Sequence, residues 1–177
     1  MLENADAITG IPGISKEHTK IYLDAPSFGA CAHTMRYGLF EGYVTGSQDG
    51  QPVAPLMGNF KDYDGGAGDF QMGPVTFMLN YPDHCVLYRF IPRSLTATDM
   101  ELVWFVREDA QEGVDYDVDK VTWLWHHTTL EDEYIITRNA AGVNSRFFEP
   151  GPYHPEFEFT LQQFVHWYLH SLEASLH

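Results

Sequence analysis

Two histidines and three consecutive acids lie close together in the C-terminal part of the chain. The segment HHTTLEDEY contains His126 and His127, followed by Glu131, Asp132 and Glu133. Imidazole and carboxylate groups can bind divalent metals or transfer protons. A run of charged side chains can equally well lie in water. The direction in which each side chain points therefore decides between a functional site and a solvated surface.

A helix over residues 118–143 would point these acids in different directions. At about 100° per residue, Asp132 falls within roughly 20° of Val121, on the stripe that also holds Asn139. Glu131 lies about 80° from the centre of that stripe, on its shoulder, and a π-bulge would rotate it inward. Asp132 is therefore predicted to face the core or an adjoining cavity, with Glu131 as the alternative.

The outer face of this helix would hold Glu133 and both histidines, which are predicted to be solvated. A buried carboxylate must be paired, protonated or bound to a metal. On periodicity alone, pairing of Asp132 with Arg138 or Arg146, or a hydrogen bond to Asn139, is favoured over a metal ligand.

Composition limits the class of protein. The net charge of −15 and the pI near 4.7 argue against nucleic acid and anionic membranes as partners. The sequence has neither a long apolar run nor a signal peptide, and its two cysteines fit a reducing cytoplasm. Cys31 begins a C-x-H, half of a Rieske cluster motif, but Cys85 does not begin the matching C-x-x-H. Cys31 is therefore predicted to be a small core residue.

The elements that would position Asp132 follow from local patterns. Residues 1–18 are predicted to be an irregular lead-in, with short strands within 18–24 and 30–44. Residues 45–73 are rich in Gly, Asp and Pro and predict a long loop, with a short helix near 55–60. Residues 74–108 predict an antiparallel meander with strands at 74–81, 84–92 and 100–108.

Two helices are expected after the meander. The first covers about 117–142, capped by Asp117 or Asp119 and ended by Gly142, and the second covers about 158–175. The expected fold class is α+β: an antiparallel sheet packed on a long helix, of the helix-grip (START-like) kind. The chain is interpreted as one partial domain over residues 1–177.

The pattern VTWLWHHTTLEDEYIITRNAAGVNSRFFEPGPYHPEFEFTLQQFVHWYL resembles the end of the catalytic domain of Rieske non-haem iron oxygenase α subunits. That family has a helix with an acidic pair, an N-x-G-V-x-S-R-like segment, a Pro/Gly-rich connection and an aromatic helix. The stretch YPDHCVLYRFIP resembles its meander. The resemblance runs from about Gly73 to Leu172 and is strongest to members that act on quaternary ammonium compounds, such as glycine betaine or carnitine oxygenases.

The resemblance implies roles for several residues. Asp132 would be the carboxylate ligand of a mononuclear Fe(II), beside two histidines. Asn139 would orient that carboxylate without itself binding the iron. Phe77, Leu79 and Val103 are expected on a sheet face that lines the substrate pocket, although core packing is the simpler role for each.

The resemblance also implies cofactors and partners. Electrons would come from a reductase or ferredoxin through a [2Fe-2S] cluster, in a homotrimer that uses O₂ on a small organic substrate.

The chain departs from the family in ways that bear on activity. It has no H-x4-H motif for the two iron histidines and no Rieske domain, and the i, i+4 pair His166 and His170 corresponds to no iron site of the family. We therefore expect it to be inactive as an oxygenase alone. The alternatives are a non-catalytic helix-grip ligand-binding module, or an assembly partner that joins a separate Rieske chain.

Overall fold

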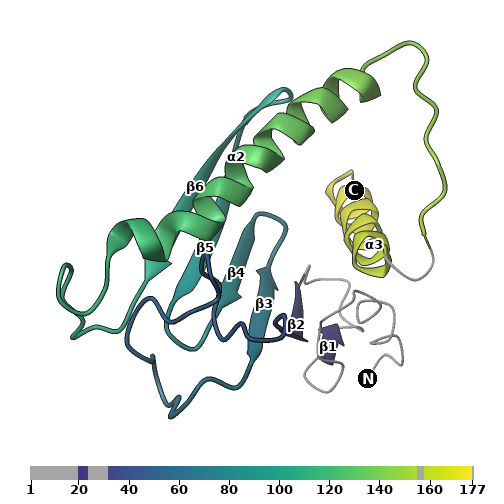
Figure 1. The fold of residues 1–177 in the computed structure, drawn as a ribbon. Coiled ribbons are helices and arrows are strands. Elements are labelled where there is room, and N and C mark those ends of the chain that lie inside the picture. The colour runs from purple at the N-terminus through teal and green to yellow at the C-terminus, as the bar shows by residue number, and fades with distance from the viewer. Residues whose placement is uncertain (1–19, 24–31, 155–157, 177) are drawn as a thin grey trace.

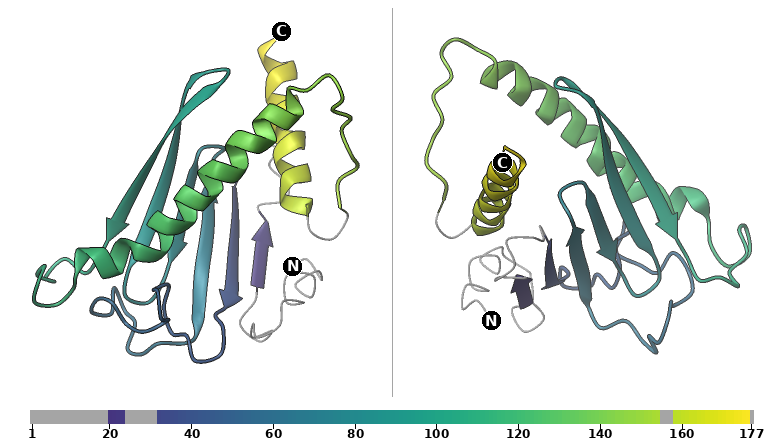
Figure 2. Two further views of the ribbon diagram at one scale, coloured as in Figure 1. Left: turned by 45° about the horizontal axis from the view of Figure 1, so that its top comes forward. Right: turned by 180° about the vertical axis from the view of Figure 1, so that it is seen from behind.

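The computed structural model describes residues 20–23, 32–154 and 158–176. A six-stranded sheet with strand order β1-β2-β3-β4-β5-β6 dominates it, and every neighbouring pair is antiparallel. The strands are β1 (Lys20–Leu23), β2 (Ala32–Gly38), β3 (Gly66–Met72), β4 (Thr76–Asn80), β5 (Cys85–Ser94) and β6 (Ala97–Phe105). Helix α2 (Val118–Val143) crosses one face of this sheet, and α3 (Phe159–Ser175) stands beside the β1–β2 end (Figures 1 and 2).

The α+β fold class and the long helix on an antiparallel sheet are as predicted. Asp117 is the residue that caps α2, because its side chain accepts a hydrogen bond from the backbone N–H of Lys120. The helix continues one residue past Gly142, to Val143. The lead-in at 1–18 and Cys31 lie outside the described residues.

The predicted loop at 45–73 was wrong at its end. Residues 66–72 form β3, which pairs with β2 on one side and β4 on the other, and the expected short helix near 55–60 is irregular backbone. Residues 93–99, expected to separate two strands, instead belong mostly to β5 and β6. Pro92 lies beside a register irregularity in this hairpin, which is where a residue without an N–H can be accommodated.

The best-buried side chains gather where the loop after Val44 meets the β4–β5 turn, and they include Thr45, Tyr81, Asp83, His84 and Val86. Gly46 is required here, because a Cβ on this residue would lie 2.2 Å from the Tyr81 ring. The backbone N–H of Met57 also donates to the carbonyl of Pro82, at 2.7 Å. The loop and the turn are therefore packed into one small core.

Along α2, the covered side chains are confined to the first half of the helix. Val121 is buried, residues 122–125, 128 and 129 are half-buried, and residues 130–143 are exposed. In the part of the chain that the structure describes, no helix is apolar enough over a sufficient length to span a membrane.

Candidate functional site on the inner face of the sheet

Asp132 lies in the exposed half of α2, together with Glu131 and Glu133. The expectation that Asp132 is buried was wrong, because the described side chains cover α2 only as far as Thr129. Helical phase gives the side of the helix on which a residue lies. Burial also requires that side chains of another element pack against that side.

The ion pairs formed among the described residues do not include Asp132. Arg138, one expected partner, instead places its guanidinium 3.7 Å from the centre of the Tyr134 ring. Arg146 stacks on Phe147 in the same way, at 4.6 Å. Asn139 is exposed, and no hydrogen bond joins it to Asp132 among the described residues, so the pairing role favoured by periodicity is not found in this part of the chain.

The histidines before the acids are exposed, as predicted. His127 bonds through Nδ1 to the carbonyl oxygen of Trp123 at 2.7 Å, and its ring stacks on that indole with centroids 4.5 Å apart. These contacts lie within α2 itself and hold the His127 ring against its own helix.

Tyr88 on β5 contacts α2. Its hydroxyl lies 3.3 Å from Oγ1 of Thr129, and its ring meets Trp125 edge-on, with centroids 6.0 Å apart. Burial raises the pKa of Tyr88, and the negative charge of Asp132 raises it further, against the opposing effect of Thr129. Asp132 therefore lies near enough to act on Tyr88, which places the carboxylate on the sheet side of the helix.

The strand register shows which side chains share this inner face with Tyr88. Residues paired across antiparallel strands point to the same side. Phe77 pairs with Tyr88, and Leu79 is two residues from Phe77, so both lie on the inner face. Val103 pairs with Leu87 and therefore lies on the outer face. The expectation that Phe77, Leu79 and Val103 share one face was wrong for Val103.

Three residues that sequence reasoning missed lie on the same inner face. Asp69 pairs with Leu79, and Tyr37 is placed on this side by its pairing with Ala67, two residues before Asp69. Tyr81, two residues after Leu79, follows β4. Asp69 lies in a segment expected to be a loop, so the alternation of β3 was not followed there, whereas Tyr37 and Tyr81 lie in segments expected to be strands.

The phenol groups of this face are held in their neutral form. Burial raises the pKa of Tyr37 to about 12, and the charge of Asp69 adds to this effect. Burial also raises the pKa of Tyr81 well above its ordinary value, with Tyr37 close by. At neutral pH both hydroxyls therefore keep their protons and can donate hydrogen bonds.

Asp83 and His84 form a second titratable pair, away from this face and closed to solvent. Nδ1 of His84 lies 2.8 Å from Oδ1 of Asp83, which also accepts a hydrogen bond from the Thr45 hydroxyl. The other oxygen accepts from the backbone N–H of Val53 at 3.0 Å. The His84 ring stacks on Tyr81 with centroids 4.8 Å apart. The buried pair therefore holds the loop and Tyr81 in place. It lies in a turn, and a turn has no periodic pattern from which it could have been predicted.

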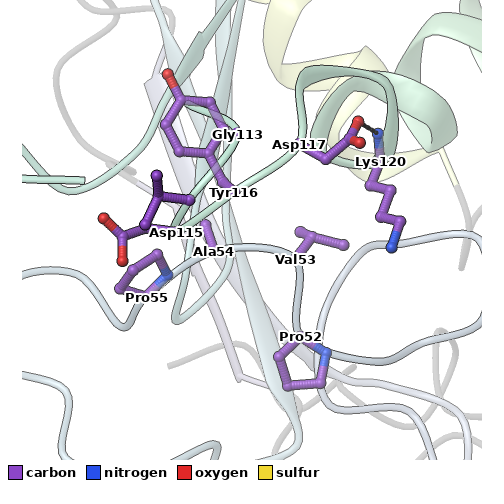
Figure 3. Close-up of a pocket in the computed structure, with 10 residues that line it drawn as sticks. Pro52, Val53, Ala54, Pro55, Gly113, Asp115, Tyr116, Asp117 and Lys120 are labelled. Carbon is purple, nitrogen blue, oxygen red and sulfur yellow. Dashed lines mark hydrogen bonds between the residues drawn. The ribbon is translucent and has the colours of Figure 1, made fainter. Parts of the chain in front are cut away.

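An open cleft of about 540 Å³ lies at the other end of α2 (Figure 3). Residues 52–55 form one side, and residues 113–117 with Lys120 form the other. At about 1.5 Å per residue, Lys120 lies roughly 18 Å along the helix axis from Asp132. The cleft therefore shares no residue with the inner-face site.

The donor set does not fit an iron centre by itself. Over residues 20–23, 32–154 and 158–176, no three His, Cys, Asp or Glu side chains are grouped so that they could hold a metal ion. Asp132 supplies one carboxylate, and a mononuclear iron of this kind needs two histidines beside it. We therefore derive no chemical step through iron from these residues.

Comparison with known proteins gives a family. The family model described as the ring hydroxylating alpha subunit, catalytic domain, matches residues 28–174, and so extends further upstream than the resemblance seen from Gly73 onward. The chain is also 34% identical over 150 residues to the glycine betaine monooxygenase oxygenase subunit of Chromohalobacter salexigens, covering 84% of this chain and 34% of that protein. It is 34% identical over 153 residues to the subunit of the same name from Pseudomonas aeruginosa strain UCBPP-PA14, covering 86% of this chain and 36% of that protein.

The chain thus spans about a third of the length of the curated relatives it matches. The family match covers most of the chain, including strands β2 to β6 of the sheet, α2 with Asp132, and nearly all of α3. The chain therefore belongs to the family of ring-hydroxylating α-subunit catalytic domains.

Proposed function

We propose that this chain is the C-terminal portion of an oxygenase catalytic domain, and that it works only together with a polypeptide portion carrying two iron histidines and a Rieske cluster. The observation that carries the proposal is the family match across residues 28–174, with Asp132 on the side of α2 that faces the sheet. In that assembly, Asp132 would be the carboxylate ligand of Fe(II). Asn139, which lies two helical turns further along the same face of α2, would orient that carboxylate.

The proposed reaction is the hydroxylation, dioxygenation or demethylation of a small organic substrate with O₂. The names of the relatives favour a quaternary ammonium compound as that substrate. Phe77 and Leu79 would line its pocket from the inner face of the sheet. A reductase or ferredoxin as electron donor, a homotrimer and a cytoplasmic location complete the proposal.

Iron analysis of the chain with and without a complementary portion tests this function. The chain would be purified alone, and also after co-expression with the part of a glycine betaine monooxygenase subunit that lies outside the match. We expect iron and betaine oxidation only in the co-expressed preparation, with both lost in Asp132→Asn and kept in Glu133→Gln. Oxidation by the chain alone, or full iron content in Asp132→Asn, would contradict the proposal.

Two alternatives give different results in the same experiment. A non-catalytic helix-grip module would bind a small ligand but hold no iron in either preparation. An assembly protein would hold iron only together with a separate Rieske chain. That Rieske chain would be its natural partner and would be encoded as its own polypeptide. The exposed position of Asp132 favours this second alternative over the first, because a ligand-cavity anchor would be enclosed.

A further inference from the structure

Two exposed histidines lie on one side of α3, a helix that carries none of the residues proposed for the iron site. His166 and His170 are four residues apart, and both side chains are exposed to solvent. At about 100° per residue, they differ by only roughly 40° around the helix axis. Side chains at this spacing have their Cβ atoms about 5–6 Å apart. The two imidazoles can therefore reach a common point above the surface of the helix.

This spacing is one that proteins use to bind metal ions. Two histidines at i and i+4 on one helix face hold the zinc ion of some metalloproteases, together with a further protein ligand. Glu173 lies on nearly the same side of α3, one turn after His170. Among the described residues, however, no three such side chains are grouped closely enough to hold an ion. The two histidines would therefore be the only protein ligands from this region, and water would complete the coordination.

The other interactions of these imidazoles are compatible with metal binding. Both histidines also interact with other groups in this structure. An imidazole has two ring nitrogens, so one can bind a metal ion while the other donates a hydrogen bond. Histidines that bind metals in proteins almost always have such a second contact.

The ligand type indicates which ions would bind. Imidazole nitrogen suits copper, nickel and zinc, and affinity among the divalent ions of the first transition row is highest for Cu²⁺. Fe²⁺ lies low in the same order. Two imidazoles on α3 would therefore bind Cu²⁺ or Zn²⁺ in preference to the iron of the proposed oxygenase site.

Helix α3 has few of the local features that stabilise a helix. Its N-cap residue, Glu158, forms no side-chain hydrogen bond of the capping kind, and the first turn contains no acidic residue. The last turn contains no basic residue. The Gln163 side chain connects α3 to β2 by a hydrogen bond from Nε2 to the carbonyl oxygen of Ala32, 3.2 Å long. An ion that joins two successive turns would therefore have a clear effect on the stability of this helix.

We propose that His166 and His170 bind a divalent transition-metal ion, Cu²⁺ most tightly and Zn²⁺ less tightly, at a site on α3. One nitrogen of each imidazole binds the ion. The unfolded chain does not hold the two imidazoles together, so binding of the ion favours the folded helix. This site shares no residue with the inner face of the sheet, and the proposal does not rest on the proposed oxygenase function.

Titration of the purified, metal-free chain with Cu²⁺, followed by calorimetry and by electron paramagnetic resonance, tests the assignment. We expect the tightest Cu²⁺ site to show two coordinated imidazole nitrogens. Loss of a mere supporting partner weakens metal binding by about 10–100-fold, so His166→Gln and His170→Gln should each weaken this site at least about tenfold. Zn²⁺ should raise the Tm of the wild-type chain and leave the Tm of both variants unchanged.

Two control variants separate a chelating pair from histidines in general. The double variant His170→Gln, Ser171→His keeps the number of histidines but moves the second imidazole by about 100° around the helix. It should bind Cu²⁺ as weakly as His170→Gln alone. His126→Gln removes an exposed histidine from α2 and should leave the tightest site as in the wild type.

Three results would overturn the proposal. They are an unchanged Cu²⁺ affinity in both single variants, wild-type affinity in the double variant, and a single coordinated imidazole nitrogen in the wild-type chain. Because both histidines are exposed and glutamine is a good helix former, the variants should fold as the wild type does. Circular dichroism of the metal-free proteins checks this expectation.

Discussion

Replacing Asp83 by asparagine should strongly destabilise the fold. The carboxylate is fully buried and accepts hydrogen bonds from the Thr45 hydroxyl, from the Val53 N–H at 3.0 Å and from His84 Nδ1 at 2.8 Å. An amide keeps one acceptor oxygen and presents a donor in place of the other, so at least one of these donors would face another donor. A hydrogen bond to a charged group contributes about 1.5–3 kcal/mol, and an unsatisfied buried donor costs about 1–3 kcal/mol.

We therefore expect the free energy of unfolding to fall by about 2–4 kcal/mol, a large share of the roughly 5–15 kcal/mol of a typical domain. Urea unfolding followed by tryptophan fluorescence at about pH 7 measures this difference. Asp99→Asn on the outer face is the control, and its exposed ion pair with Arg93 should change stability by no more than about 1 kcal/mol.

The effect of Asp83→Asn should also depend on pH, with a definite sign. Burial by itself raises the pKa of the Asp83 carboxyl, but the bonds from His84, Thr45 and Val53 outweigh it and hold that pKa below its usual value. A lowered folded-state pKa stabilises the native state above the unfolded pKa of about 3.9, and this stabilisation is lost as the pH falls. The difference in the free energy of unfolding between wild type and Asp83→Asn should therefore become smaller below about pH 4. A decrease in the free energy of unfolding of less than about 1 kcal/mol at neutral pH would refute the reasoning, and so would a difference between the two proteins that grows in acid.

Three further changes test other parts of the structure. Gly46→Ala should lower the free energy of unfolding by about 1–3 kcal/mol, because its Cβ would overlap the Tyr81 ring; urea unfolding at wild-type stability would show that the loop moves freely. Tyr88→Phe removes the hydroxyl contact with Thr129 and should cost about 1 kcal/mol in the same assay, whereas an unchanged midpoint would mean that this contact is not formed in solution. Asp117→Ala removes the N-cap of α2 and should cost about 1 kcal/mol with some loss of helical circular dichroism, and Asp117→Asn should retain most of the stability.

The strands richest in β-branched and aromatic residues could be predicted because their own composition favours an extended chain. β4, β5 and β6 are of this kind. The strand β3 has the sequence GAGDFQM, which is poor in such residues, and it becomes a strand because β2 and β4 bind both of its edges. Those partners are set by the tertiary fold and cannot be read from the segment alone.

The side of α2 on which Asp132 lies could be predicted from helical phase, but its exposure to solvent could not. The phase of α2 placed Asp132 on the sheet side, where it acts on Tyr88, yet phase carries no information on what covers the helix. Val103 was expected on the inner face from the family resemblance and not from strand register, and its pairing with Leu87 places it on the outer face. Asp69 was missed with its strand, and the buried Asp83 was missed because turns have no period.

The exposed half of α2 has a consequence for how the iron-binding carboxylate of the proposal would be held. Residues 130–143 are all exposed among the described residues, so local hydrogen bonds and helix propensity contribute most to maintaining their conformation. Isolated helical segments of about this length are marginal in water. We expect the backbone amides beyond Thr129 to exchange with solvent faster than those of the preceding turns. A partner that covers this segment would then slow that exchange and order the Asp132 carboxylate in the same event, so that folding of the helix end and completion of the site would be one coupled equilibrium.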